Sequence, residues 1–348
     1  MAAFDPNSAG DGGIFGLRGT ELDAALVLLP VPWEATTSYG SGASQGPAAI
    51  LKASAQIDLF DPEVLKPYEP GIFMRPEAKE VRRWNKTAKA AAQKVIRAGG
   101  LVGGRPELRK ALATANALGA KLNEWVYRES LALMKGGKIV GVVGGDHSVP
   151  LGAFQAATES YGKLGLLHFD AHIDMRDAYE GLRWSHASIM HNALTAFPRI
   201  EKIVQVGIRD FCEQEDDFVR SQGPRVRIFQ QAALERRRFA GEPWDKVAAE
   251  IVDELPKQVW VTVDIDGLDP RFCPGTGTPV PGGLEFAELN RILAILAGSG
   301  RKILGFDLVE VAPSPGGSEW DANVGMRLLY KLAAWTFVSR GLRLPRQA

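Results

Sequence analysis

The sequence has few cysteines, no net charge and no long apolar run, and each absence excludes a class of protein. Only Cys212 and Cys273 are cysteine among 348 residues, which excludes a disulfide framework and favours a reducing compartment. Basic and acidic residues balance at 41 each, so charge gives no support to a nucleic-acid or anionic-membrane partner. No stretch is apolar for long enough to cross a bilayer, and residues 1–16 lack the features of a signal peptide. We therefore expect a cytoplasmic protein.

Short apolar runs alternate with helical patterns along most of the chain. The runs are nearly continuous and rich in β-branched residues, which is typical of parallel strands covered on both faces. This alternation predicts a parallel α/β sheet. The predicted strands lie at 24–31, 138–145, 164–172, 202–210, 258–267 and 302–311, and helices are predicted at 150–162, 244–257 and 286–298.

One segment departs from this alternation. Residues 79–135 have a helical pattern with a Gly-rich break at 97–107 and no convincing strand. We interpret this segment as a helical elaboration on one domain that spans residues 1–348.

Chemically active side chains follow four of the predicted strands. They lie in the segments GGDHS (144–148), DAHID (170–174), DIDGLDP (264–270) and FDLVE (306–310). Because the carboxyl ends of parallel strands share one edge of a sheet, we expect these segments to form one site. Alternate residues of an extended chain point to the same side, so each D-x-H-x-D or D-x-D set should converge. The side chains concerned are His147, Asp170, His172, Asp174, Asp264, Asp266 and Glu310.

The charges of this set indicate metal ions. Four aspartates and two neutral imidazoles are balanced by two divalent ions, and two ions roughly 3.5–4 Å apart are an established hydrolytic arrangement. These ligand types suit Mn²⁺, with Ni²⁺, Fe²⁺, Co²⁺ and Zn²⁺ as alternatives. Each motif alone could be a turn or a helix cap, but their combination indicates a metal site.

The four segments resemble, in the same order, the signatures of the ureohydrolases, the family of arginase and agmatinase. The resemblance covers residues 28–332 and includes VEVAP at 309–313. It implies a three-layer α/β/α fold with a mainly parallel sheet of about eight strands. It also implies two metal ions with Asp170 and Asp264 as shared ligands. One ion would add His147 and Asp174, and the other would add His172 and Asp266.

The resemblance further implies hydrolysis of a small guanidino compound to urea and an amine or ammonia. His186, in the segment WSHASIM (184–190), is similar to an agmatinase histidine that relays protons. Glu310 would bind the substrate cation, and Asp174 would act in catalysis. We also predict that Trp320 forms a pocket wall that binds substrate, although it could instead cap the apolar face of a final helix at 323–337.

Several alternatives remain open from the sequence. Residues 189–200 have few polar groups that could bind the α-amino and α-carboxylate groups of arginine. We therefore rank agmatine and other small guanidines above arginine as substrates, with guanidine and biguanides also possible. The family usually forms trimers or hexamers, and a subunit of a hetero-oligomer is a second possibility. A single-zinc deacetylase of related fold is a third, but it would leave His147, Asp174 and Asp266 without a purpose. His168 is predicted to be a hydrogen-bonded core residue, and His191 a surface or packing residue.

Overall fold

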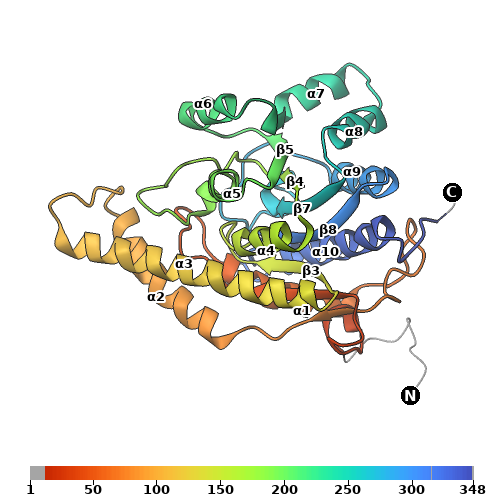
Figure 1. Ribbon diagram of the computed structural model, residues 1–348, viewed down its shortest axis with the longest axis horizontal. Helices are drawn as coiled ribbons and strands as arrows, with labels where there is room; N and C mark the ends of the chain where they lie inside the picture. The colour runs from red at the N-terminus through yellow and green to blue at the C-terminus, as the bar shows by residue number, and fades with distance from the viewer. Residues whose placement is uncertain (1–11, 315, 347–348) are drawn as a thin grey trace.

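The computed structural model describes residues 12–314 and 316–346, and these residues build one eight-stranded sheet. The strand order is β2-β1-β3-β8-β7-β4-β5-β6, and every pairing within it is parallel. Figure 1 shows β3, β8, β7, β4 and β5 in the interior, with helices around them. This confirms the predicted α/β fold with a parallel sheet of about eight strands. The strands are β1 Leu26–Val31, β2 Ile72–Met74, β3 Ile139–Gly144, β4 Leu164–Phe169, β5 Ile200–Ile208, β6 Val226–Gln230, β7 Gln258–Asp264 and β8 Lys302–Val309.

Helices cover both faces of the sheet, which makes three layers. The apolar residues of α1, α8, α9 and α10 pack on one face, and those of α2, α3, α4 and α5 pack on the other. Because both faces are covered, every residue of β1, β3 and β4 is buried, as the continuous apolar runs predicted. The helices are α1 Gly46–Ala53, α2 Lys79–Ile96, α3 Pro106–Lys135, α4 Leu151–Tyr161, α5 Ile189–Ala196, α6 Glu213–Ser221, α7 Gln231–Phe239, α8 Trp244–Asp253, α9 Phe286–Gly298 and α10 Trp320–Ser339.

The two strands at the edges of the sheet were not predicted. β2 has only three residues, and in β6, with the sequence VRIFQ, only Val226 and Phe229 are buried. An edge strand has a neighbour on one side only and is covered less completely, so its sequence lacks the continuous apolar run of an interior strand.

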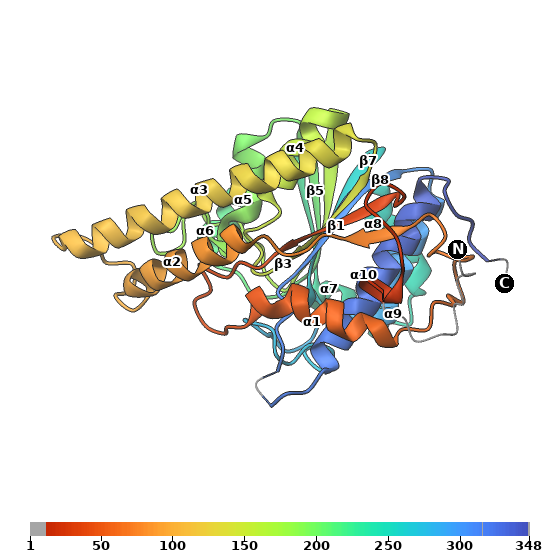
Figure 2. The same ribbon diagram turned by 90° about the horizontal axis from the view of Figure 1, so that it is seen from below.

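Residues 79–135 form a long helical arm, as their pattern predicted. α2 and α3 lie side by side and extend beyond the sheet (Figure 2). A small core of their own, which includes Ala92, Val95 and Ala115, holds the two helices together. α3 continues back along α4, so the arm is joined to one outer layer of the sheet. None of the described helices has the length and apolar character to span a membrane.

The order of the strands brings the chemically active segments together. β3, β8, β7 and β4 are consecutive neighbours in the middle of the sheet, and each of the four predicted segments lies at the carboxyl end of one of them. Parallel strands end at the same edge, so the four segments meet there. We call this region the carboxyl edge and define it by residues 144–148, 170–174, 264–270 and 306–310.

Candidate metal centre

His147 lies at the centre of the carboxyl edge and is buried. Its Nδ1 lies 3.0 Å from an Asp170 oxygen and 3.3 Å from one oxygen each of Asp174 and Asp264. The backbone N–H of His147 donates to Glu310 Oε1 at 3.0 Å. Carboxylates from the ends of β4 and β7 therefore surround the imidazole Nδ1 of His147, and Glu310 at the end of β8 binds its backbone N–H.

The side chains of the D-x-H-x-D segment point to one site, but the backbone conformation that directs them there differs from the predicted one. We expected an extended chain over 164–172, but β4 ends at Phe169, and Asp174 has a left-handed backbone with φ of 56°. The amide N–H groups of Met190 and His191 donate to the Asp174 carbonyl at 3.0 and 3.4 Å, which stabilises this conformation. A turn rather than strand alternation thus directs Asp174 toward His147.

The two aspartates after β7 also lie on a turn. Asp264 is the last residue of β7, and residues Ile265–Gly267 form a 3-10 turn, where an extended chain was expected. The Asp264 carboxylate accepts the backbone N–H of Asp266 at 2.9 Å, which caps this turn. The Asp266 carboxylate accepts the Ala171 N–H at 3.0 Å, so this side chain reaches across to the segment after β4.

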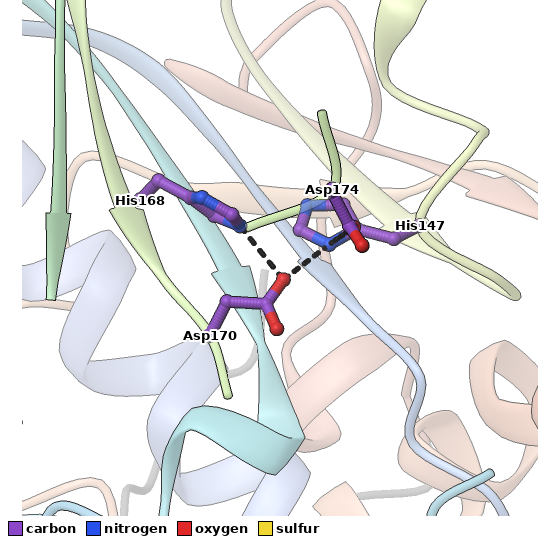
Figure 3. Close-up of side chains that lie close together, drawn as sticks. All are labelled: His147, His168, Asp170 and Asp174. Carbon is purple, nitrogen blue, oxygen red and sulfur yellow. Dashed lines mark hydrogen bonds and ion pairs between the residues drawn. The ribbon is translucent and has the colours of Figure 1, made fainter. Parts of the chain in front are cut away.

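Two groups of potential ligands share Asp170. One group contains His147, His168, Asp170 and Asp174, and the other contains Asp170, His172 and Asp266. The two Asp170 oxygens divide between them, since Oδ2 lies 3.0 Å from His147 Nδ1 and Oδ1 lies 3.4 Å from His172 Nδ1 (Figure 3 shows the first group). Ligand bonds of about 2.1 Å that meet at a right angle place donor atoms roughly 3 Å apart. The donor spacing therefore fits metal coordination at both groups.

The electrostatics show an excess of negative charge at the carboxyl edge. Burial opposes the charged form of His147 and His172, but the neighbouring carboxylates outweigh it and raise the pKa of both rings. Burial and the surrounding carboxylates raise the pKa of Asp264 well above its usual value and that of Asp174 to about 7. Burial also opposes ionisation of Asp170, but the nearby His168 and the hydrogen bond from His147 outweigh it and lower the pKa of Asp170. Cations would remove this mutual repulsion, which is the expected property of an ion site.

Glu310 has one satisfied and one unsatisfied carboxylate oxygen. It follows β8 with φ of 60°, and its backbone N–H donates to the Gly145 carbonyl at 2.7 Å. Oε1 accepts the His147 N–H, whereas Oε2 is buried and no described residue donates to it. Burial and the charge of Asp264 raise the pKa of Glu310 well above its usual value. A cation beside Oε2 would compensate for this burial.

His186 lies outside the four segments of the carboxyl edge and lines the same cavity as His172 and Asp174. Its Nδ1 lies 3.2 Å from Thr36 Oγ1, and the Thr36 hydroxyl donates to Asp146 Oδ2 at 3.1 Å. We assign the ring hydrogen to Nδ1, because the Thr36 hydroxyl hydrogen is used on Asp146 and the other hydroxyl near Nδ1, that of Ser185, is farther away at 3.4 Å. Burial lowers the pKa of His186 to about 4, so the ring is neutral at pH 7 with Nε2 free to accept.

A second set of polar side chains, inside β7 and β8, supports the other nitrogen of the His147 ring. His147 Nε2 lies 2.9 Å from Thr262 Oγ1, and that hydroxyl donates to Asp307 at 2.7 Å. The Trp260 indole N–H donates to the other Asp307 oxygen at 2.7 Å. Sequence reasoning missed Thr262 and Asp307. Their signal was a polar residue inside each of the apolar runs QVWVTVD and KILGFDLVE.

A cavity of about 140 Å³ opens beside the carboxyl edge. The residues that line it are Ser38, His172, Asp174, Arg176, Tyr179, His186, Ala187, Asp210, Phe211, Glu215 and Thr278. Neither Glu310 nor Trp320 is among them. The Trp320 side chain is about half exposed at the start of α10, and its indole N–H donates to the Arg271 carbonyl at 3.0 Å. The substrate-binding role of Trp320 therefore stays a prediction.

Comparisons with known proteins agree with this geometry. The family model described as the arginase family matches residues 24–334. N(1)-aminopropylagmatine ureohydrolase of Thermus thermophilus is 33% identical over 304 residues, which cover 86% of this chain and 87% of the relative. The structure of proclavaminate amidinohydrolase from Streptomyces clavuligerus has a TM-score of 0.67 and 25% identity, over 91% of this chain and 92% of the other. A hypothetical agmatinase from Burkholderia thailandensis has a TM-score of 0.70 and 24% identity, over 97% and 93% of the two chains.

Proposed function

We propose that this chain, which belongs to the arginase family, is a two-metal hydrolase that cleaves a guanidinium group to urea. The observation that carries the proposal is the position of Asp170, whose two oxygens face two separate ligand groups. One shared carboxylate between two such groups is the arrangement that a pair of divalent ions requires. A single-zinc deacetylase needs only one of these groups. The ureohydrolases among the relatives also favour cleavage of a guanidinium group over deacetylation.

The reaction adds a water oxygen to the guanidinium carbon and breaks a C–N bond, and the leaving nitrogen departs with a proton. When bound, the two ions lower the pKa of a water molecule and stabilise the negative charge that develops. We assign His147, Asp170 and Asp174 to one ion and Asp170, His172 and Asp266 to the other. We assign Asp264 to both, as the resemblance implied. Asp174 lines the cavity and thereby also faces the substrate.

Glu310 is our candidate for binding the substrate cation. Its Oε2 lacks a donor among the described residues, while its other oxygen is fixed by the His147 N–H. A Cβ built on Gly277 would lie 3.6 Å from Oε2, so the neighbouring loop approaches this oxygen without a side chain. A planar guanidinium offers charge-assisted hydrogen bonds to such an oxygen.

His186 is our candidate for proton transfer. Its Nε2 accepts, and its Nδ1–H is held by the Thr36 hydroxyl, which is in turn bonded to Asp146. This chain fixes the ring orientation and stabilises the charge that the ring gains when it takes a proton. His186 can then deliver that proton to the leaving nitrogen.

The cavity favours a small or narrow substrate. Its volume of about 140 Å³ suits a guanidinium group and a slender chain rather than a bulky one. Asp210 and Glu215 add two carboxylates to its lining, against one arginine, Arg176, which favours a cationic substrate. We therefore place agmatine-like compounds and guanidine first, with biguanides as an alternative.

We also propose the identity of the ions, the compartment and the assembly. Carboxylate oxygens with a few imidazoles suit Mn²⁺, and Ni²⁺ is the alternative. The unpaired Cys212 and Cys273 fit a reducing cytoplasm. The resemblance to ureohydrolases supports a homo-oligomer, a trimer or a hexamer, and a hetero-oligomer remains a second candidate.

The test is urea release by the purified chain loaded separately with Mn²⁺, Ni²⁺ and Zn²⁺. The substrates are agmatine, N(1)-aminopropylagmatine, guanidine, a biguanide and arginine, with an acetylated polyamine as the control for deacetylation. We expect urea from at least one guanidino compound and two ions bound per chain. Acetate release with one zinc bound would contradict the proposal. A chain that binds two ions but releases urea only with a second subunit would support the hetero-oligomer.

A further inference from the structure

His168 lies beside Asp170, the ligand that the two groups share. It is a fully buried residue of β4, two positions before Asp170. Its Nε2 lies 2.7 Å from Asp170 Oδ2, the same oxygen that lies 3.0 Å from His147 Nδ1 (Figure 3). Distance alone would allow His168 to be either a metal ligand or a hydrogen-bond donor to a ligand. The other ring nitrogen decides between the two.

The partner of His168 Nδ1 is Gln205 on the neighbouring strand β5. The Gln205 Nε2 lies 2.8 Å from His168 Nδ1 and 2.8 Å from the Ile173 carbonyl oxygen. A carbonyl oxygen needs a donor, so the amide nitrogen of Gln205 must face this side. Gln205 thus donates to Nδ1, which must be the unprotonated nitrogen. The hydrogen of the neutral ring is therefore on Nε2 and points at Asp170.

We propose that His168 is a positioning residue that holds the shared carboxylate of Asp170 by an Nε2–H···Oδ2 hydrogen bond, and that it is not itself a ligand. This inference rests on the proposed two-metal function. A protonated Nε2 has no lone pair for a metal, whereas a carboxylate oxygen can accept a hydrogen bond and also bind an ion. With Oδ2 fixed, Oδ1 is directed toward the group that contains His172.

The surrounding sheet makes this support rigid. His168 pairs in register with Gln205 on β5 and with Thr262 on β7, so hydrogen-bonded strands lie on both sides of it. Gln205 and Thr262 are also fully buried. His168 therefore cannot turn its ring without the loss of two buried hydrogen bonds, and the orientation of Asp170 is set before an ion binds.

The test compares metal binding by wild type, His168→Phe and His168→Gln. Calorimetric titration with Mn²⁺ measures the affinity, metal analysis measures the number of ions, and electron paramagnetic resonance measures the magnetic coupling that depends on the bridging carboxylate. We expect His168→Phe to bind two ions at saturation, with affinity reduced roughly 10- to 100-fold and altered coupling. The amide of His168→Gln can still donate to Asp170 and should restore most of the affinity.

Two results would overturn the inference. Loss of one ion from His168→Phe even at saturating Mn²⁺ would make His168 a ligand, and wild-type affinity with unchanged coupling would leave it without a positioning role. If His168→Phe does not fold, Gln205→Met replaces it, because this change removes the hydrogen bond that holds Nδ1 of the His168 ring. We expect weaker Mn²⁺ binding there too, and unchanged binding and coupling would count against the inference. Wild type that lacks magnetic coupling and urea release would instead refute the proposed function, separately from His168.

Discussion

The carboxyl edge and the helical arm of α2 and α3 differ in what they bury. The carboxyl edge buries polar and charged side chains, and the arm buries mainly apolar ones. At the carboxyl edge, Asp170 and His147 are buried, and each is held by several polar neighbours. In the arm, the interior consists of small apolar residues such as Ala92 and Ala115, and most charged side chains face solvent. Burial of charge is costly without partners, and the carboxyl edge concentrates buried carboxylates where the proposed chemistry uses them. Substitutions at the edge should therefore affect function, and substitutions in the arm should affect stability alone.

The largest effect is expected from Asp264→Asn. This change removes one negative charge from the ligand set with almost no change in shape, and the shared position of Asp264 makes it important to both ions. We expect loss of metal from the site and loss of detectable turnover. Metal analysis and urea release measure the two quantities. Two ions bound and a near-normal rate would show that Asp264 does not bridge.

His186→Ala should reduce kcat by a factor on the order of 10²–10⁴, the usual range for general acid–base catalysis. The metal content should stay at two ions per chain, because His186 bonds to Thr36 and lies outside both ligand groups. The measurement is kcat at saturating substrate together with metal analysis. A variant that loses metal along with activity would make His186 a structural residue or a ligand.

Glu310→Gln should lower kcat/KM for guanidinium substrates by roughly 10- to 100-fold, which corresponds to about 1.5–3 kcal/mol for a hydrogen bond to a charged group. The amide keeps the shape and the bond from the His147 N–H but removes the charge opposite the substrate. Thermal unfolding serves as the control and should change little. If kcat/KM is unaltered, another group receives the cation.

The smallest functional effect is expected in the arm. Ala92 is fully buried, so Ala92→Leu should overpack the small core and destabilise the protein by roughly 1–3 kcal/mol. Leu101 is 71% exposed, and Leu101→Ser is the matched control with an expected change within about 0.5 kcal/mol. Both variants should keep the wild-type kcat. A large fall in kcat for either variant would show that the arm takes part in catalysis. It would contradict the claim that substitutions in the arm affect stability alone.

The interior of the fold was predictable because burial on both faces imposes a continuous apolar pattern. All six predicted strands are present, whereas β2 and β6 at the edges were missed because partial exposure breaks that pattern. The arm was predictable because the buried residues of α2, from Val81 to Val95, recur at helical spacing.

The types of ligand at the carboxyl edge were predictable, but their local backbone was not. Asp174 and Asp266 reach the site through turns that propensity does not reveal, since the left-handed conformation of Asp174 depends on contacts with α5. The supporting residues Thr262, Asp307 and Gln205 were also missed. Their roles arise from register across neighbouring strands, which pairs residues far apart in the sequence.

The central claim is that Asp170 is shared by two ions that together hydrolyse a guanidinium group. The most direct test is a titration of the metal-free chain with Mn²⁺, in which bound metal and urea release from agmatine and guanidine are measured at each step. We predict binding that saturates at two ions per chain, with urea release that follows occupancy of the second ion. Full activity at one ion per chain, or saturation at one ion, would contradict the account.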